Sequence, residues 1–144
     1  VKHAVIRRYK EDDHELFVMV TAGVGNAVDA ARGHLHAEPQ RVGTINLWVI
    51  INGVLSDESF MQAMMTTIEA KVKAMQDGEI YDTQTGTIAT GTSTDSVLIA
   101  STQSGQNYEY AGTITDIGKL IGRGVYETMI IALDDYKRAK GWIQ

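Results

Sequence analysis

The segment Thr44–Asn52 constrains the fold of this chain more than any other part of the sequence. Its alternate residues Ile45, Leu47, Val49 and Ile51 place one aliphatic face on an extended strand. The opposite face also carries apolar side chains, Trp48 and Ile50, between two asparagines. Apolar residues on both faces predict a strand that is buried on both sides, or nearly so. The chain is therefore expected to fold around a sheet with this strand near its centre.

A long helix is expected directly after this strand, over Ser56–Met75. Ser56 can cap its first turn, and Gly78 can supply a left-handed stop. Its apolar residues step by three or four positions and form one stripe, consisting of Met61, Met64, Met65, Ile68, Val72 and Met75. This spacing favours core packing, and the alternative is an adaptable methionine-rich binding face.

The other expected elements are strands at Val5–Tyr9, Glu15–Thr21 and Ser96–Ser101, a short helix at Asn26–Arg32 and a last helix at Thr115–Lys140. Residues Lys10–His14 would link the first two strands into a hairpin with a turn longer than the tightest kind. A helix between two buried strands indicates a crossover. The order predicts a single-domain layered sandwich over residues 1–144, of the α/β or α+β class, with a mixed sheet and two long helices.

Composition excludes several functions. The chain has no cysteine, so thiol catalysis and thiolate metal sites are excluded. Its formal net charge is −5, and its one basic cluster, Arg7–Lys10, is followed at once by three acidic residues, which argues against nucleic-acid binding. No apolar run approaches the length of a membrane span, and no signal peptide opens the chain. We expect a cytoplasmic protein.

Three segments rich in glycine and hydroxyl residues are candidates for chemistry. In Thr21–Ala27, Gly23 and Gly25 allow close approach of a ligand, and amides of the following helix start can hold an oxyanion. The segment Gly86–Asp95 holds five hydroxyl side chains and a carboxylate. Tyr110–Asp116 enters the last helix. For each segment a purely structural role, as a turn, strand entry or helix cap, is the alternative.

Charged residues on the helices add further candidates. Glu69 flanks the methionine stripe, where half-burial would raise its pKa and suit it to acid–base catalysis, whereas a solvated ion pair with Lys73 is the simpler interpretation. Arg123 and Glu127 can form a surface ion pair or line a pocket. His34 and His36 could ligate a metal, but two ligands do not make a catalytic zinc site. We therefore expect no metal.

Taken in order, these segments resemble the adenosylcobinamide amidohydrolase family. The residues that carry the resemblance are Thr21–Ala27, Gly43–Leu47, Glu69–Lys71, Ala89–Asp95, Tyr110–Thr113 and Leu120–Glu127, within about residues 5–133. The family hydrolyses the amide that joins the aminopropanol arm to a corrin ring, which yields adenosylcobyric acid and 1-amino-2-propanol for corrinoid salvage. The resemblance implies the same reaction here, with the corrinoid as substrate and no cofactor that can be read from the sequence.

Under this resemblance the candidates take hypothetical roles. Glu69 or Asp95 would activate water, and Thr92 or Thr94 is the rival nucleophile. The expected substrate-binding residues are Gly23, Gly25, Asn26, Asn46, Gly91, Thr113 and Arg123.

Family members carry a serine- and glycine-rich segment upstream, and the chain begins with Val1, so we expect a short variant or a chain that lacks an N-terminal segment. A non-catalytic corrinoid-binding protein is the alternative function. The glycines of the last helix raise the prospect of a homo-oligomer.

Overall fold

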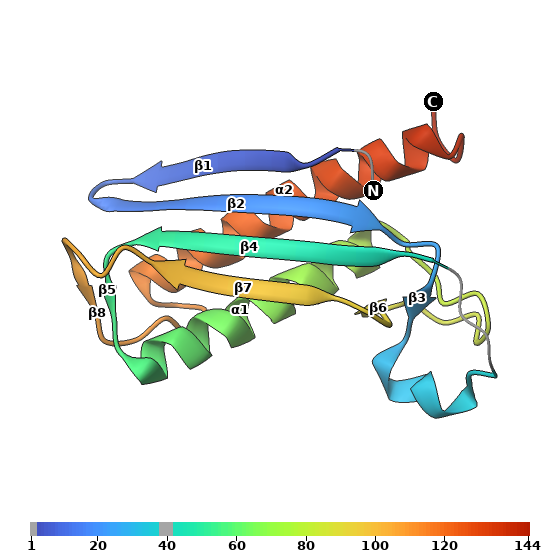
Figure 1. The fold of residues 1–144 in the computed structure, drawn as a ribbon, viewed down its shortest axis with the longest axis horizontal. Coiled ribbons are helices and arrows are strands. Elements are labelled where there is room, and N and C mark those ends of the chain that lie inside the picture. Colours follow the sequence, from blue (N-terminus) through green and yellow to red (C-terminus); the bar gives the residue numbers. More distant parts are fainter. Residues whose placement is uncertain (1–2, 38–41) are drawn as a thin grey trace.

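A computed structural model describes residues 3–37 and 42–144. Four strands, β1 (Val5–Glu11), β2 (His14–Gly23), β4 (Thr44–Asn52) and β7 (Ser96–Ser101), form one sheet in the order β1-β2-β4-β7 (Figure 1). The pairs β1–β2 and β2–β4 are antiparallel, whereas β4–β7 is parallel. Together with the two long helices α1 (Asp57–Asp77) and α2 (Asp116–Ala139), this mixed sheet confirms the predicted fold class.

Short elements close the two ends of the sheet. Strand β3 (Ala27–Val28) pairs with β6 (Gly91–Thr92), and β5 (Val54–Leu55) pairs with β8 (Asn107–Tyr108). The short helix expected at Asn26–Arg32 is misplaced, because β3 comes first. A 3-10 helix, η1 (Ala30–Leu35), follows it and is capped by the Asp29 side chain, which accepts from the amide of Ala31.

The hairpin between β1 and β2 is tighter than expected. Its register runs from Val5 opposite Val20 to Glu11 opposite His14, which leaves only Asp12 and Asp13 between the strands. Asp12 adopts a positive φ of 50°, a conformation that a short polar side chain tolerates better than most.

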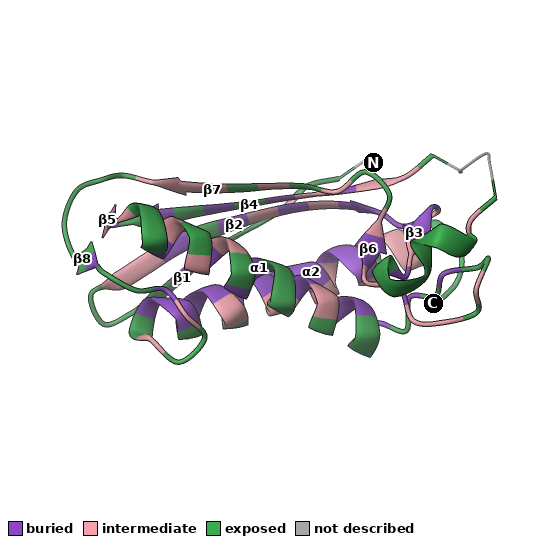
Figure 2. Ribbon diagram, turned by 90° about the horizontal axis from the view of Figure 1, so that it is seen from below, coloured by how far each residue is buried: buried purple, intermediate pink, exposed green. Residues whose placement is uncertain are grey.

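The molecule has two layers, with both helices on one face of the sheet (Figure 2). The inward side chains of β2 and β4 are fully buried, which defines the centre of the core. On the outward face, Phe17, Trp48, Ile50 and Leu98 each remain about 40% exposed. The expectation that β4 is buried on both sides is therefore wrong, because helices cover only one face of the sheet.

Helix α1 begins where expected, since Ser56 accepts from the amide of Ser59. The prediction that the methionine stripe forms the core face of α1 is wrong. Met61 is 69% exposed and Met65 is 60% exposed. The buried side chains are mostly small, namely Ser59, Ala63, Thr66, Thr67, Lys71, Ala74 and Met75. Small residues let α1 lie close to α2 and the sheet, where three more methionines would not fit.

The ends of the helices also differ from expectation. Gly78 caps α1 in the right-handed region, and Glu79 takes the positive φ of 52° instead. In α2, a Cβ on Gly124 would come within 2.9 Å of the Tyr9 ring, and Gly122 faces Thr66 of α1. These glycines serve packing within the chain, so they give no support for an oligomer. None of the helices in the described ranges is long and apolar enough to cross a membrane.

Candidate active site

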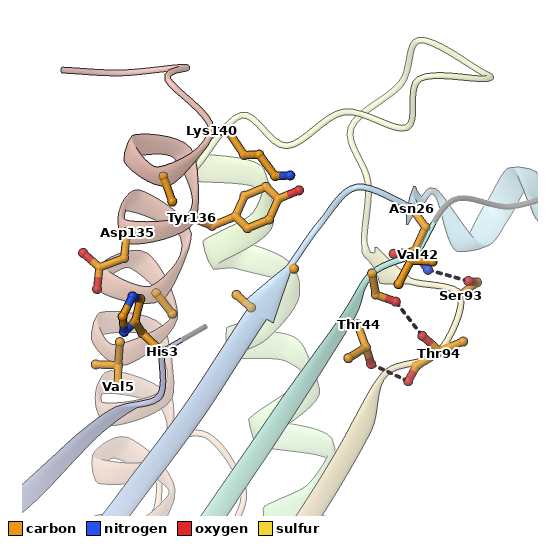
Figure 3. A pocket seen from close by; sticks show the side chains of 15 residues that line it. His3, Val5, Asn26, Val42, Thr44, Ser93, Thr94, Asp135, Tyr136 and Lys140 are labelled. Atoms are coloured by element: carbon orange, nitrogen blue, oxygen red, sulfur yellow. Dashed lines mark hydrogen bonds between the residues drawn. The ribbon is translucent and has the colours of Figure 1, made fainter. Parts of the chain in front are cut away.

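A cavity of about 870 Å³ opens at the end of the sheet where β2 finishes and β4 starts (Figure 3). It lies between these strand ends, the turn before β7 and the last turns of α2. Apolar side chains, including Val5, Ala22 and Ala132, form part of its lining. Its volume falls in the range of about 300–1,000 Å³ that is usual for small-molecule sites.

One wall of the cavity carries the hydroxyl groups of Thr44, Ser93 and Thr94, which are held by backbone carbonyl oxygens and by Asn26. Thr44 donates through Oγ1 to the carbonyl oxygen of Thr94 at 2.8 Å, and Thr94 Oγ1 donates to the carbonyl oxygen of Gly43 at 2.8 Å. Asn26 Nδ2 donates to Ser93 Oγ at 2.8 Å (Figure 3). Because Ser93 Oγ accepts this bond, its own hydrogen is available for a ligand.

The position of Asn26 depends on a glycine. A Cβ on Gly43 would overlap Asn26 Oδ1, so only glycine lets the carboxamide lie against this backbone. The Asn26 side chain is thus fixed with its amide aimed at Ser93. Asn26 therefore holds the Ser93 oxygen from one side.

The opposite wall comes from α2 and the residues before β1. Tyr136, Asp135 and Lys140 line it together with His3. Burial raises the pKa of the Tyr136 phenol, so that it keeps its proton at neutral pH and can donate to an acceptor. The Tyr136 hydroxyl lies close to Gly25, where a Cβ would be 3.4 Å from it. This wall offers donors and charges of both signs across the cavity from the hydroxyl groups.

A buried ion pair stands behind the hydroxyl wall. Lys71 of α1 donates through Nζ to Asp95 Oδ2 at 2.5 Å, and the two side chains are only 9% and 14% exposed. Asp95 Oδ1 also accepts from Thr92 Oγ1 at 2.5 Å and from the amides of Thr92 and Ile45. The carboxylate therefore clamps the turn that carries Ser93 and Thr94 into the cavity.

Two backbone amides in the segments expected to stabilise an oxyanion are already engaged. The amide of Ala27 donates to the carbonyl oxygen of Val24, and strand β3 replaces the expected helix start. The amide of Thr92 donates to Asp95. The hydroxyl group of Ser93 lines the cavity and is a further candidate donor to an oxyanion there.

A second buried network lies outside the cavity lining and holds η1 against the segment after α1. Asp82 is fully buried and accepts from His36 Nε2 at 2.6 Å and from the amides of Asp29, Gln84 and Thr85. His36 is thereby bound to a carboxylate, while His34 is exposed within η1. In the described ranges, no group of three His, Asp or Glu side chains is arranged to hold a metal ion.

Acid should destabilise the protein partly through Asp82. Burial acts to raise its pKa, but the four hydrogen bonds outweigh burial and lower the pKa to about 2. Because the folded pKa lies below the ordinary value of 3.8, the stabilisation is complete above about pH 4 and is lost as the pH falls towards 2.

We expect Asp82→Asn to lower the free energy of unfolding by roughly 2 kcal/mol at pH 6 and to flatten the acid limb of stability against pH. Urea unfolding between about pH 2 and 6 measures this, with Asp13→Asn in the exposed hairpin turn as control. An unchanged acid limb in Asp82→Asn would contradict the assignment.

Comparison with known proteins identifies the chain. A sequence model of the adenosylcobinamide amidohydrolase family matches residues 1–141. The chain belongs to this family. It is similar to the adenosylcobinamide amidohydrolase of Methanosarcina mazei, at 28% identity over 133 residues, which is 86% of the chain. It is also similar to the uncharacterized protein MJ1613 of Methanocaldococcus jannaschii, at 34% identity over 95 residues, or 65% of the chain. The matched regions are 58% and 37% of those two relatives.

Three of the segments that resemble the amidohydrolase family meet at the cavity. Gly23, Asn26 and Thr94 line it, together with Gly43 and Thr44 from the second segment. Gly25 adjoins the Tyr136 hydroxyl. Gly91, Thr92 and Asp95 lie immediately behind the hydroxyl wall, where a Cβ on Gly91 would overlap Asp95 and come within 2.7 Å of Lys71 Nζ. The structure thus brings together the first, second and fourth of these segments.

The remaining predicted site residues lie elsewhere. Glu69 is exposed on α1, so the expected half-burial is wrong. Asn46 is not part of the cavity lining and donates to Thr21 Oγ1. Arg123 pairs with Glu127 and lies 3.9 Å from Glu11 at the hairpin end of the sheet, and exposed Thr113 precedes α2 at that same end. The structure does not place any of these four side chains in the cavity.

Two functional candidates were missed by sequence reasoning. Ser93 was passed over among five neighbouring hydroxyl residues, and nothing in the pattern distinguishes it from Thr92 or Thr94. Lys71 had a usable signal, because it falls on the same helical face as Ala63, Thr67 and Ala74. A lysine among small residues at helical spacing indicates a buried cation with a partner.

Proposed function

We propose that this chain is a cytoplasmic amidohydrolase that cleaves the aminopropanol amide of adenosylcobinamide, giving adenosylcobyric acid and 1-amino-2-propanol for corrinoid salvage. The cavity at the ends of β2 and β4 would hold the scissile amide. Membership of the adenosylcobinamide amidohydrolase family supports the reaction class. The similar adenosylcobinamide amidohydrolase of Methanosarcina mazei supports the choice of substrate.

The observation that carries the proposal is the meeting of three family segments around one ligand-sized cavity. Thr21–Ala27, Gly43–Leu47 and Ala89–Asp95 are far apart in the sequence, yet each contributes to the cavity or its hydroxyl wall. Glycines at positions 43 and 91 are required by close contacts there. Such convergence of polar groups in a concavity is typical of an active site.

We assign the Ser93 hydroxyl group the role of hydrogen-bond donor to the carbonyl oxygen of the scissile amide. Hydrolysis adds hydroxide from water to the carbonyl carbon, breaks the C–N bond and places the remaining proton on the leaving amine. Negative charge builds up on the carbonyl oxygen in the transition state, where a fixed donor stabilises it. Ser93 can supply that donor because Asn26 holds its oxygen. His3 and Asp135 on the opposite wall are the groups that can accept a proton from water.

The decisive experiment is direct product detection. Purified protein incubated with adenosylcobinamide is expected to release adenosylcobyric acid and 1-amino-2-propanol, which mass spectrometry of the reaction mixture identifies. Cobinamide without the adenosyl group serves as a comparison substrate. Absence of both products over a full pH range would contradict the catalytic proposal.

A non-catalytic corrinoid-binding protein is the second candidate. It is favoured by one observation: Asp95, the carboxylate nearest the hydroxyl wall, is fully occupied by Lys71 and the turn. Titration with cobinamide, followed by its visible spectrum, separates the two. Binding without product formation favours this candidate, whereas product formation excludes it.

A further inference from the structure

The hydroxyl group of Tyr136 faces the cavity without a partner in the protein. Tyr136 is half-buried on α2, and its side chain points across the cavity from the wall that α2 provides (Figure 3). Within residues 3–37 and 42–144 its hydroxyl group forms no hydrogen bond. Burial raises the pKa of the phenol, so the group keeps its proton and remains a hydrogen-bond donor at neutral pH.

The other tyrosines show how unusual this hydroxyl group is. Three of them lie in buried or half-buried positions, and each hydroxyl group has a side-chain partner: Tyr9 bonds to Thr128 at 2.9 Å, Tyr108 to His14 at 2.8 Å, and Tyr126 to Asp77 at 2.8 Å. The remaining two, Tyr81 and Tyr110, are 50% and 57% exposed, so solvent can satisfy them. A half-buried phenol that faces a cavity without a protein partner indicates that its acceptor belongs to a ligand.

The Tyr136 ring is held in place on several sides. Trp142 packs against it edge-on, with the ring centroids 5.6 Å apart and the ring planes at 85°. Gly141, at a φ of 73°, turns the chain after α2 and lets Trp142 return to the helix. Lys140 Nζ lies 5.7 Å from the ring centroid, and a Cβ on Gly25 would be 3.4 Å from the hydroxyl oxygen. A donor fixed in this way selects a ligand by the position of its acceptor atom.

Two uncharged donors therefore stand on opposite walls of the cavity. Ser93 lies on the turn before β7, and Tyr136 lies on α2. Ala22 and Ala132 contribute apolar surface to the same cavity. This lining suits a short chain that carries an acceptor oxygen near each end and carbon atoms in between.

The arm that the proposed reaction removes has this pattern. Its amide carbonyl oxygen and its hydroxyl oxygen both accept hydrogen bonds, and the carbon atoms of the propanol are apolar. With the carbonyl oxygen at Ser93, the hydroxyl oxygen is the acceptor that remains for Tyr136. Both oxygens are uncharged in the substrate, which matches two neutral donors.

We propose that Tyr136 binds the hydroxyl group of the leaving amino alcohol and so determines substrate specificity. The preferred substrates are then amides of 2-hydroxyalkylamines, in contrast to amides of plain alkylamines. This inference rests on the proposed function, because the place of the carbonyl oxygen at Ser93 comes from that function. It goes further by assigning a residue to a part of the substrate that does not react.

Two substrates that differ in one hydroxyl group test the assignment, namely adenosylcobinamide and the N-propyl amide of adenosylcobyric acid. Wild type is expected to cleave the N-propyl amide with a kcat/KM about 10- to 100-fold lower, because this substrate leaves the phenol donor buried and unpaired. In Tyr136→Phe the preference should fall below about threefold, mainly through lost activity on adenosylcobinamide. Steady-state kinetics on both substrates measures the preference.

Tyr126→Phe is the matched control, since it removes the same group from the same helix at a position outside the cavity lining. It should leave the preference unchanged. The inference is overturned if wild type cleaves both substrates equally, if Tyr136→Phe lowers kcat/KM equally for both, or if Tyr126→Phe abolishes the preference as well. Equal loss on both substrates would place the Tyr136 hydroxyl group at the amide instead.

Binding measurements separate this inference from the proposed reaction. The visible spectrum of each corrinoid gives its dissociation constant for each protein, whether or not hydrolysis follows. A preference of about 10- to 100-fold in binding that is lost in Tyr136→Phe supports the inference even if no product forms, and only the proposed reaction then fails. Product formation without any preference leaves the reaction standing and overturns the inference. Absence of binding to both corrinoids overturns both.

Discussion

Lys71→Met is expected to lower the free energy of unfolding by about 3 kcal/mol, the largest stability effect of any single change considered. The substitution keeps the length of the side chain but leaves the Asp95 carboxylate without its cation in a site where it is only 14% exposed. Removing one partner of a buried ion pair leaves an uncompensated charge, which typically costs about 3–5 kcal/mol. Residual exposure of Asp95 places the expectation at the lower end of that range. Thermal unfolding should shift by roughly 6–12 °C.

The control for Lys71 lies two residues further along the same helix. Lys73 pairs with Asp77 at the surface, with its side chain 57% exposed. Lys73→Met removes the same charge from the same helix but should change stability by less than about 0.5 kcal/mol. Equal effects of the two substitutions would show that the Lys71–Asp95 pair does not clamp the turn.

Ser93→Ala is expected to reduce kcat for the proposed hydrolysis by about 100- to 1,000-fold, which is the usual effect of deleting one oxyanion donor. KM should change little, because the lost hydrogen bond is strongest in the transition state. Steady-state kinetics with adenosylcobinamide measures both constants. Ser93 is exposed and lies outside the core, so stability should stay within about 0.5 kcal/mol of wild type.

A serine in an exposed loop at the other end of the sheet provides the control. Ser104→Ala removes a hydroxyl group without touching the cavity and should leave kcat and KM unchanged. If Ser93→Ala retains full activity while Asn26→Ala loses it, the donor to the carbonyl oxygen is a different group and Asn26 acts independently of Ser93.

The sequence alone determined the framework of this protein. Alternating residues in Thr44–Asn52 predicted β4 with its observed bounds, and Ser56 marked the start of α1. Local rules suffice there, because strand periodicity and N-capping depend on residues close in the chain. The ordered segments also indicated the family, which the match over residues 1–141 confirms.

Tertiary structure decided which face of each element is buried and which site residues meet. The methionine stripe of α1 has the spacing of a core face, yet the small residues beside it are buried, since the distance to α2 leaves room only for them. Likewise, Arg123 and Asn26 looked equally plausible as ligand contacts, but only Asn26 lines the cavity. The spacing of apolar residues predicts whether a segment is a helix or a strand, but it does not predict which of its faces another element will cover. The pairing of Asn26 with Ser93 and of Lys71 with Asp95 joins residues that only the fold brings together.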